Sequence, residues 1–199
     1  LAYRMRPKTL EEYVGQEHVL GKDKILYRTI KADRLSSIIL FGPPGCGKTS
    51  LAKVISETTK YKFYKINAVT AGVADIKRVI EETKNFMINP TGKSILFIDE
   101  IHRFNKLQQD ALLPYVENGL IILIGATTEN PYFEVNKALI SRSMVIKLEP
   151  LTEENIYKIL KNSLTREDGL KQYSIKVEDE TLKKLASISN GDVRTALNL

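Results

Sequence analysis

Cysteine is nearly absent from this sequence, because Cys46 is the only one among 199 residues. A single cysteine can form no internal disulfide and no zinc site built from cysteines, so the apolar core must hold the fold together. No apolar run approaches the roughly 18 residues of a membrane span, and the start, LAYRMRPKTL, lacks the apolar region of a secretory signal. We therefore expect a cytoplasmic protein with no membrane partner.

Internal repeats and low-complexity tracts are also missing. Hydrophobic residues make up 43% and charged residues 27% of the chain, which is typical of a folded globular protein. The net charge of +6 permits a polyanionic partner such as nucleic acid, but the lysines are spread along the whole chain. The chain starts without Met and stops at NGDVRTALNL, inside a helical pattern, so we expect a fragment of a longer protein.

Short apolar runs alternate with segments of helical periodicity, which predicts an α/β fold with a five-stranded parallel sheet covered by helices on both faces. The predicted strands are residues 37–41, 63–67, 94–98, 120–124 and 144–148. Crossover helices are predicted at 48–59 and at 75–87, where Met87 would share the apolar face of the second helix. A third helical pattern covers 105–117, and Pro114 is expected to end or kink it.

The strand signals fade after Pro150, and the residues from Thr152 resemble a helix start. Further helices are predicted at 178–189 and from 192 onward. We therefore divide the chain into a nucleotide-binding core at 1–150 and a small all-helical lid at 151–199, which is truncated.

The strongest motif is GPPGCGKT at 42–49, which matches the P-loop, or Walker A, pattern and lies between a predicted strand and a predicted helix. Its glycines allow backbone N–H groups to surround a triphosphate at a helix N-terminus. Lys48 is expected to reach the β and γ phosphates of ATP, and Thr49 to bind Mg²⁺. Cys46 is interpreted only as a small residue of the loop. The predicted nucleotide contacts are Pro44, Gly45, Cys46, Gly47, Lys48, Thr49 and Ser50.

A second motif, SILFIDE at 94–100, is an apolar strand that ends in two acids, as a Walker B strand does. In a parallel sheet it delivers Asp99 to the carboxyl edge, where Thr49 also lies, so Asp99 is predicted to hold Mg²⁺ through water. Glu100 is placed to orient and deprotonate a water molecule, which favours hydrolysis over mere binding. His102 follows closely, and we interpret it as a lone surface histidine.

A third strand, within IGATTEN at 124–130, ends in hydroxyl and amide groups. Thr128, with Thr127 as the alternative, is predicted to hydrogen-bond the γ phosphate or the attacking water. An ordinary Thr-rich loop would have a similar sequence, so the position after a strand carries this interpretation.

With these motifs in place, nearly the whole chain resembles the AAA+ ATPases. The resemblance implies that Arg142, in SRS at 141–143, is an arginine finger that reaches the ATP of a neighbouring subunit. It also implies that Arg194, in GDVR at 191–194, is a second sensor that touches the γ phosphate of its own subunit. A guanidinium fork suits both roles because it stabilises charge on transferring phosphate oxygens. A surface arginine and a helix-end arginine are the alternatives.

Within AAA+, the sequence is most similar to the replication-associated recombination protein A family, relatives of the Werner-helicase-interacting ATPase. This similarity rests on RMRPKTLEEYVGQEHVLG at 4–21, NAVTAGVADIKRVIEE at 67–82, DEIHRFNKLQQDALLPYVENG at 99–119 and GATTENPYFEVNKALISR at 125–142. It suggests that Val14, Gly15 and Gln16 line the adenine pocket. Arg4, Arg6, Pro7 and Ile156 are expected to help.

The resemblance further implies ATP turnover in DNA replication, recombination and repair at stalled or gapped forks. Implied partners are single-stranded, gapped or forked DNA, other copies of the full-length protein, and a single-stranded-DNA-binding protein, with a nucleoid-associated location. A clamp-loader-like or RuvB-like DNA motor subunit remains an alternative, although the zinc-binding cysteine cluster of many clamp-loader subunits is absent. A small-molecule kinase and a nucleotide-switched scaffold with little turnover also remain open.

Overall fold

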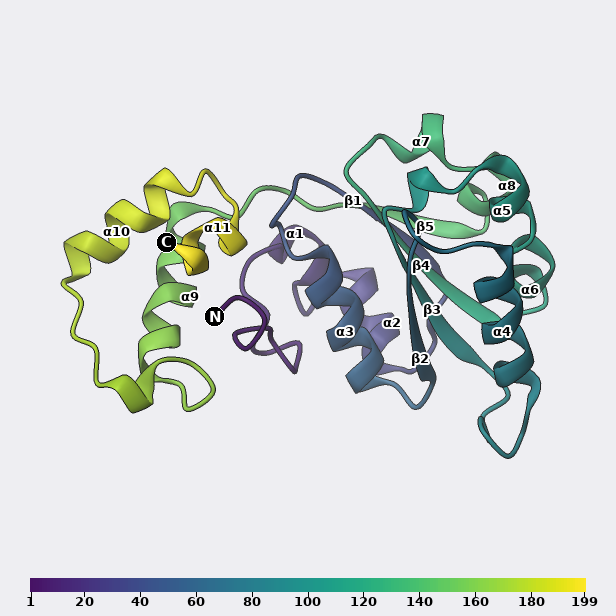
Figure 1. Cartoon of the computed structure of the whole chain (residues 1–199), viewed down its shortest axis with the longest axis horizontal. Helices are drawn as coiled ribbons and strands as arrows, with labels where there is room; N and C mark the ends of the chain where they lie inside the picture. The colour runs from purple at the N-terminus through teal and green to yellow at the C-terminus, as the bar shows by residue number, and fades with distance from the viewer.

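The computed structural model describes residues 1–199 and contains one five-stranded parallel sheet (Figure 1). The strand order is β2-β3-β4-β1-β5, with every neighbouring pair parallel. The strands are β1 (Ser37–Phe41), β2 (Lys62–Asn67), β3 (Ser94–Asp99), β4 (Ile121–Thr127) and β5 (Ser143–Lys147). The predicted α/β fold is thus confirmed. The main difference is that β4 continues to Thr127 rather than ending at Ile124.

Alternate residues of the central strands point to opposite faces of the sheet, and both faces are buried by helices. On one side, Ile38 and Leu40 pack with α2 (Ile25–Lys31) and α3 (Lys48–Thr58). On the other, Ile39 packs with α4 (Val73–Lys84) and the segments that follow β3 and β4. Figure 1 shows α3 and α4 on opposite sides of the sheet. The sheet is therefore the middle of three layers.

The predicted helix at 75–87 is wrong at its end, because α4 stops at Lys84 and Asn85 adopts an extended conformation. Met87 lies beyond the helix and is 94% exposed, so it contributes nothing to the predicted apolar face. Asn85 ends the helix by turning its side-chain oxygen to the backbone N–H of Met87, which offers the chain a local alternative to another helical turn.

The helical segment at 105–117 is interrupted, as Pro114 led us to expect. It forms α5 (Lys106–Asp110) and α6 (Leu113–Glu117), with Pro114 in the first turn of α6, where its missing N–H costs little. The other short elements were not predicted. They are α1 (Glu17–Leu20), α2, η1 (Ile101–Arg103), α7 (Pro131–Glu134), α8 (Lys137–Ile140) and η2 (Lys171–Tyr173). No helix of the chain is both long enough and apolar enough to span a membrane.

The residues after Pro150 form three helices, α9 (Glu153–Thr165), α10 (Asp179–Ile188) and α11 (Val193–Asn198). Thr152 caps α9 by accepting a hydrogen bond from the N–H of Asn155 at 3.2 Å. Their apolar faces form a third core cluster that also takes in Met5 from the N-terminal segment. In Figure 1 this helical unit lies to one side of the sheet, with the N-terminus between them.

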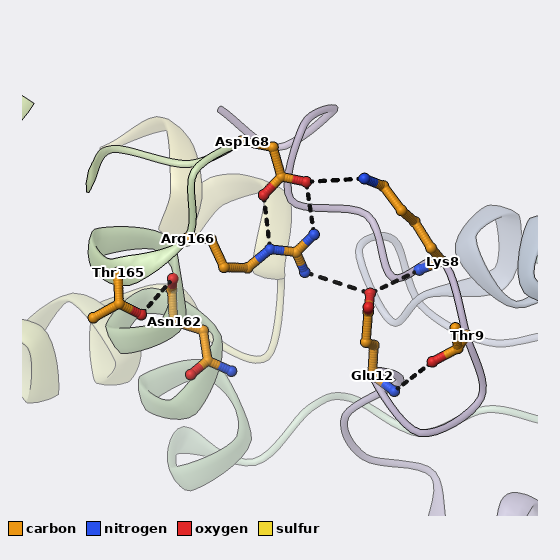
Figure 2. A network of polar contacts seen from close by, with 7 residues as sticks. All are labelled: Lys8, Thr9, Glu12, Asn162, Thr165, Arg166 and Asp168. Carbon is orange, nitrogen blue, oxygen red and sulfur yellow. Dashed lines mark hydrogen bonds and ion pairs between the residues drawn. The ribbon is translucent and has the colours of Figure 1, made fainter. Parts of the chain in front are cut away.

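A polar network joins the N-terminal segment to the turn after α9 (Figure 2). Arg166 donates two hydrogen bonds to Asp168, at 2.8 and 2.7 Å, and lies 3.5 Å from a carboxylate oxygen of Glu12. Lys8 lies 3.3 Å from Asp168 through its ammonium, and its backbone N–H donates to Glu12 at 3.0 Å. These bonds tie together segments more than 150 positions apart in the sequence.

This network predicts a pH-dependent contribution of Asp168 to stability. The hydrogen bonds from Arg166 hold the pKa of Asp168 well below its ordinary value of 3.8, so its contribution to stability is fully present above that value and is lost progressively as the pH falls from there toward the lowered pKa. We expect Asp168→Asn to lower the thermal unfolding midpoint at neutral pH, and the deficit to shrink below about pH 4. Glu180→Gln, at an exposed carboxylate of α10, is the control, and an equal loss in both variants would contradict the assignment.

Candidate functional site

The P-loop connects β1 to α3 at the carboxyl edge of the sheet. Gly47 immediately precedes α3 and has φ +104°, and Gly45 has φ +69°, conformations that side chains rarely adopt. A Cβ on Gly47 would overlap the hydroxyl of Tyr13, and one on Gly45 would overlap Asp192 at the start of α11. The loop therefore requires glycine at both positions, for backbone conformation and for close approach of the lid.

Lys48 begins α3 and is almost fully buried. Its ammonium donates to the carbonyl oxygens of Gly42 at 2.7 Å and Pro43 at 2.8 Å, within its own loop. A buried ammonium needs such acceptors, and phosphate oxygens placed inside the loop would offer stronger, charged ones. Lys48 therefore lies at the position that the P-loop motif predicts.

Strand β3 ends at Asp99, which lies beside Asn67 of β2 in the sheet register and 3.8 Å from the ammonium of Lys65. Glu100 then adopts a left-handed conformation with φ 56°, which is strained for a residue with a side chain. Such strain persists only where the surrounding structure imposes it, and it is common at functional sites. This turn takes the chain out of the sheet and starts η1.

A polar chamber of about 110 Å³ lies where these segments meet, and no hydrophobic residue lines it. It brings together the predicted phosphate, metal, base and sensor residues from the P-loop, the start of α3, the ends of β3 and β4, and α11. The lining residues are Pro44, Gly45, Gly47, Lys48, Thr49, Asp99, Glu100, Thr128 and Arg194. Of the two threonines left open by the sequence, Thr128 faces this chamber, whereas Thr127 is fully buried beside it.

His102 is not the surface residue that the sequence suggested, because its side chain is only 9% exposed. Its Nδ1 lies 2.8 Å from the hydroxyl of Thr127 and 3.4 Å from a carboxylate oxygen of Glu100. The left-handed turn at Glu100 folds η1 back against the end of β4, which buries the imidazole. Only the closeness of His102 in sequence to Asp99 and Glu100 could have signalled that its side chain lies at the site.

A second, more apolar cavity of about 70 Å³ lies between the P-loop, the N-terminal segment and the lid. Val14, Arg6 and Pro7 line it, as expected for the base of a nucleotide. Arg4 does not line it, and Ile159 takes the place expected for Ile156, which is buried in the core of the lid. Which of Ile156 and Ile159 faces the cavity follows from the rotation of α9 about its axis, and the sequence left that rotation undetermined.

Gly15 and Gln16 do not line this cavity either. The amide nitrogen of Gln16 donates to the carbonyl oxygens of Cys46 at 3.2 Å and Glu149 at 2.7 Å, and its oxygen accepts from the N–H of Glu149 at 3.0 Å. Gly15 instead packs against Leu151. Gln16 therefore fastens the N-terminal segment to the P-loop and to the start of the lid, and its side chain is not free to face a base.

Burial controls the ionisation of two groups beside the P-loop. It raises the pKa of the Cys46 thiol, an effect that the nearby ammonium of Lys48 only partly offsets. It also raises the pKa of the Tyr13 phenol, whose hydroxyl donates to the carbonyl oxygen of Gly47 at 3.2 Å. Both groups therefore stay neutral at physiological pH, and Cys46 acts as a small apolar residue of the loop, in keeping with its interpretation from the sequence.

Arg142 lies outside both cavities, just before β5. Its guanidinium contacts Glu117 at 2.7 Å and the carbonyl oxygen of Ala138 at 3.0 Å, and its side chain is 42% exposed. The structure thus separates Arg142 from the other predicted catalytic residues of its own chain.

The donor set of the polar chamber fits Mg²⁺. Thr49 and Asp99 both line it and both offer oxygen, although no group of three or more histidine, cysteine, aspartate or glutamate side chains is arranged to hold a metal. Mg²⁺ commonly takes only one or two protein ligands and completes its shell with waters and substrate phosphates. These two residues are therefore sufficient for an ion that arrives with a nucleotide.

The close approach at Gly47 gives a direct test of the loop. We expect Gly47→Ala to weaken ATP binding at least 10-fold and to lower the unfolding midpoint, because strain of about 1–2 kcal/mol adds to the overlap with Tyr13. Gly119→Ala is the matched control, since Gly119 has φ +72° but open space around it. Binding is measured with a fluorescent ATP analogue. Equal ATP affinity in the two variants would show that the overlap is unimportant.

The family model described as the Holliday junction DNA helicase RuvB P-loop domain matches residues 5–153. The chain is also similar to the Thermotoga maritima RuvB Holliday junction branch migration motor, with a TM-score of 0.79 and 28% identity. That match covers 98% of this chain and 63% of the other. Both comparisons agree with the observed sheet and P-loop.

Curated relatives match the whole chain at higher identity. Replication-associated recombination protein A of Coxiella burnetii is 49% identical and that of Bacillus subtilis is 48% identical, with 45% and 46% of those proteins covered. The ATPase WRNIP1 of Dictyostelium discoideum is 47% identical, with 23% of its length covered. The chain thus spans less than half the length of these relatives. It belongs to the AAA+ ATPases of the replication-associated recombination protein A and WRNIP1 family, with a P-loop domain of the RuvB type.

Proposed function

We propose that this chain is the ATP-hydrolysing unit of a protein that couples Mg²⁺-dependent ATP turnover to DNA remodelling at stalled or gapped replication forks. One observation carries the chemical part of the proposal. A single polar chamber gathers a buried lysine, a metal-binding pair, a carboxylate and a sensor threonine from separate elements. The lysine and the metal ligands would serve nucleotide binding alone, whereas a carboxylate placed beside them suits the activation of water for hydrolysis.

Each residue of the chamber has a distinct task. The N–H groups of the P-loop and the ammonium of Lys48 bind the β and γ phosphates, and they orient the γ phosphorus toward the end of β3. Glu100 accepts a proton from the attacking water. Thr128 and Arg194 hold γ-phosphate oxygens, where negative charge shifts during transfer. Thr49 and, through water, Asp99 would hold Mg²⁺, which would supply positive charge to neutralise the transferring phosphate.

The apolar cavity next to the chamber is suited to the adenine base. It is lined by Gly47 of the P-loop, which also lines the chamber, and by Ser50 of α3, so a nucleotide can place its base there while its phosphates occupy the chamber. Leu151 and Ile159 of the lid line the same cavity. Nucleotide bound in this way would contact the core and the lid together, which supports a lid that responds to the bound nucleotide.

Assembly is the next part of the proposal. Arg142 is exposed and lies outside the chamber, so it is available to a neighbouring copy rather than to its own nucleotide once its ion pair with Glu117 opens. An arginine finger supplied across an interface would stabilise the transition-state charge on the neighbour's γ phosphate. Full-length homo-oligomers would then be the active form.

The proposed work on DNA rests on the names of the similar proteins, replication-associated recombination protein A and the RuvB branch migration motor. The net charge of +6 is compatible with a DNA partner. We propose single-stranded, gapped or forked DNA as the substrate, a single-stranded-DNA-binding protein as a partner, and a cytoplasmic, nucleoid-associated location. ATPase rates of the full-length protein measured with a panel of DNA structures test this part, and no stimulation by any of them would count against it.

Glu100→Gln tests the assignment of the base. We expect ATP binding to be retained and hydrolysis to fall about 10²-fold or more, since the amide has the same shape but accepts no proton. Lys48→Ala is the comparison variant, in which binding itself should fail. Turnover is measured by phosphate release and binding by a fluorescent nucleotide. Hydrolysis at the wild-type rate in Glu100→Gln would place the base elsewhere.

Arg142→Ala in the full-length protein tests catalysis across subunits. We expect ATP binding nearly unchanged and turnover reduced about 10³-fold, because the arginine acts mainly in the transition state. Mixing this variant with Glu100→Gln should restore part of the activity, since some interfaces then join an intact Arg142 to an intact Glu100. Arg78→Ala, at an exposed arginine of α4, is the control. A fully active monomer that depends on Arg142 would rule out action across subunits.

A further inference from the structure

We propose that His102 is a positioning residue that holds the Glu100 carboxylate in register with the end of β4. This inference rests on the proposed function, because it assigns the support of the group that we take to be the base. Its basis is the contact of one buried imidazole nitrogen with two residues, Glu100 at 3.4 Å and Thr127 at 2.8 Å.

The backbone explains why the imidazole reaches both groups. Glu100 is in the left-handed conformation, and the N–H of Arg103 donates to the carbonyl oxygen of Glu100 at 2.8 Å, which closes the tight turn of η1. The turn brings His102 back toward the sheet. Its side chain lies beside the end of β4 and is only 9% exposed. The imidazole consequently lies beside the carboxylate that precedes it by only two positions.

Thr127 is a fixed anchor for this contact. It is fully buried, it is the last residue of β4, and its hydroxyl oxygen accepts from the N–H of Glu129 at 3.0 Å. Its carbonyl oxygen accepts from the N–H of Gly42, the first residue of the P-loop, at 3.2 Å. Through Thr127, His102 is therefore connected to the P-loop and to Thr128, the neighbouring residue that faces the polar chamber.

The arrangement requires a proton on Nδ1. A carboxylate is negative and offers no proton, so Nδ1 attracts Glu100 at 3.4 Å only when that nitrogen carries its own proton. The Thr127 oxygen can accept from both His102 and Glu129 because a hydroxyl has two acceptor sites. The N–H that bonds Thr127 then also presents its positive end to the Glu100 carboxylate 3.4 Å away, so a displacement of the β4 end would change the orientation of Glu100. A γ phosphate bound to Thr128 would in this way help to set the base.

Asparagine and glutamine at position 102 separate this role from simple filling of space. The amide nitrogen of asparagine is bonded to Cγ, as Nδ1 of histidine is, whereas that of glutamine lies one bond further out. In the full-length protein we expect His102→Gln and His102→Ala to lower kcat about 10-fold, a fraction of the effect of the base itself, with ATP affinity changed less than about 2-fold. His102→Asn should retain most of kcat.

Thr127→Val tests the same contact from the other partner with little change of volume. It should lower kcat about as much as His102→Ala. The double variant His102→Ala with Thr127→Val should lose no more kcat than either single variant, since both substitutions remove the same His102–Thr127 contact. Thermal unfolding midpoints are compared for all variants. His18→Asn is the matched control, because His18 is exposed and the one hydrogen bond of its side chain is with the Lys147 carbonyl, at 3.0 Å.

The proposal is overturned by wild-type kcat in His102→Ala, by a loss in His102→Asn as large as in His102→Gln, or by additive losses in the double variant. It is equally overturned if kcat and ATP affinity fall in parallel with the unfolding midpoint, the result of a merely structural role. Glu100→Gln is assayed alongside. An active Glu100→Gln would refute the assigned base, whereas an inactive one with fully active His102 variants would refute the positioning role alone.

Discussion

Parallel pairing of β1, β3 and β4 is the constraint on which the rest of this structure depends. Each strand in such a sheet delivers the residues that follow it to the same edge, so the P-loop, Asp99 and Thr128 converge although they are distant in the sequence. The N–H of Gly42 extends the pairing past the end of β1 by donating to Thr127. The phosphate loop and the sensor strand are thereby held in one register.

Buried polar side chains connect this edge to the segments around it. Gln16 bonds to backbone groups of Cys46 and Glu149, and Tyr13 donates to Gly47, so the N-terminal segment is attached directly to the P-loop. Asp192 of the lid packs against Gly45 from the other side. Unmet hydrogen-bonding groups are costly when buried, so these contacts favour one arrangement of core and lid.

The chemical residues were predictable because each is tied to a local pattern. GPPGCGKT lies between a strand and a helix, Asp99 is the last residue of an apolar strand, and Glu100 directly follows it. The long-range partners were not predictable. Gln16 and Glu149 are 133 positions apart, and His102 and Thr127 are 25 apart, so no local periodicity records their contacts. The orientation of α9 could not be predicted for the same reason. It places Ile159, rather than Ile156, in the lining of the apolar cavity.

The sequence by itself determined the α/β class, the strands, the P-loop and the acids at the end of β3, because hydrophobic periodicity and glycine placement act over a few residues. Tertiary structure alone decided the strand order, which of Thr127 and Thr128 faces the polar chamber, and the burial of the His102 side chain. Those outcomes depend on which elements pack together and on the left-handed turn at Glu100. The surrounding fold imposes that strained conformation on a residue that would not adopt it readily in isolation.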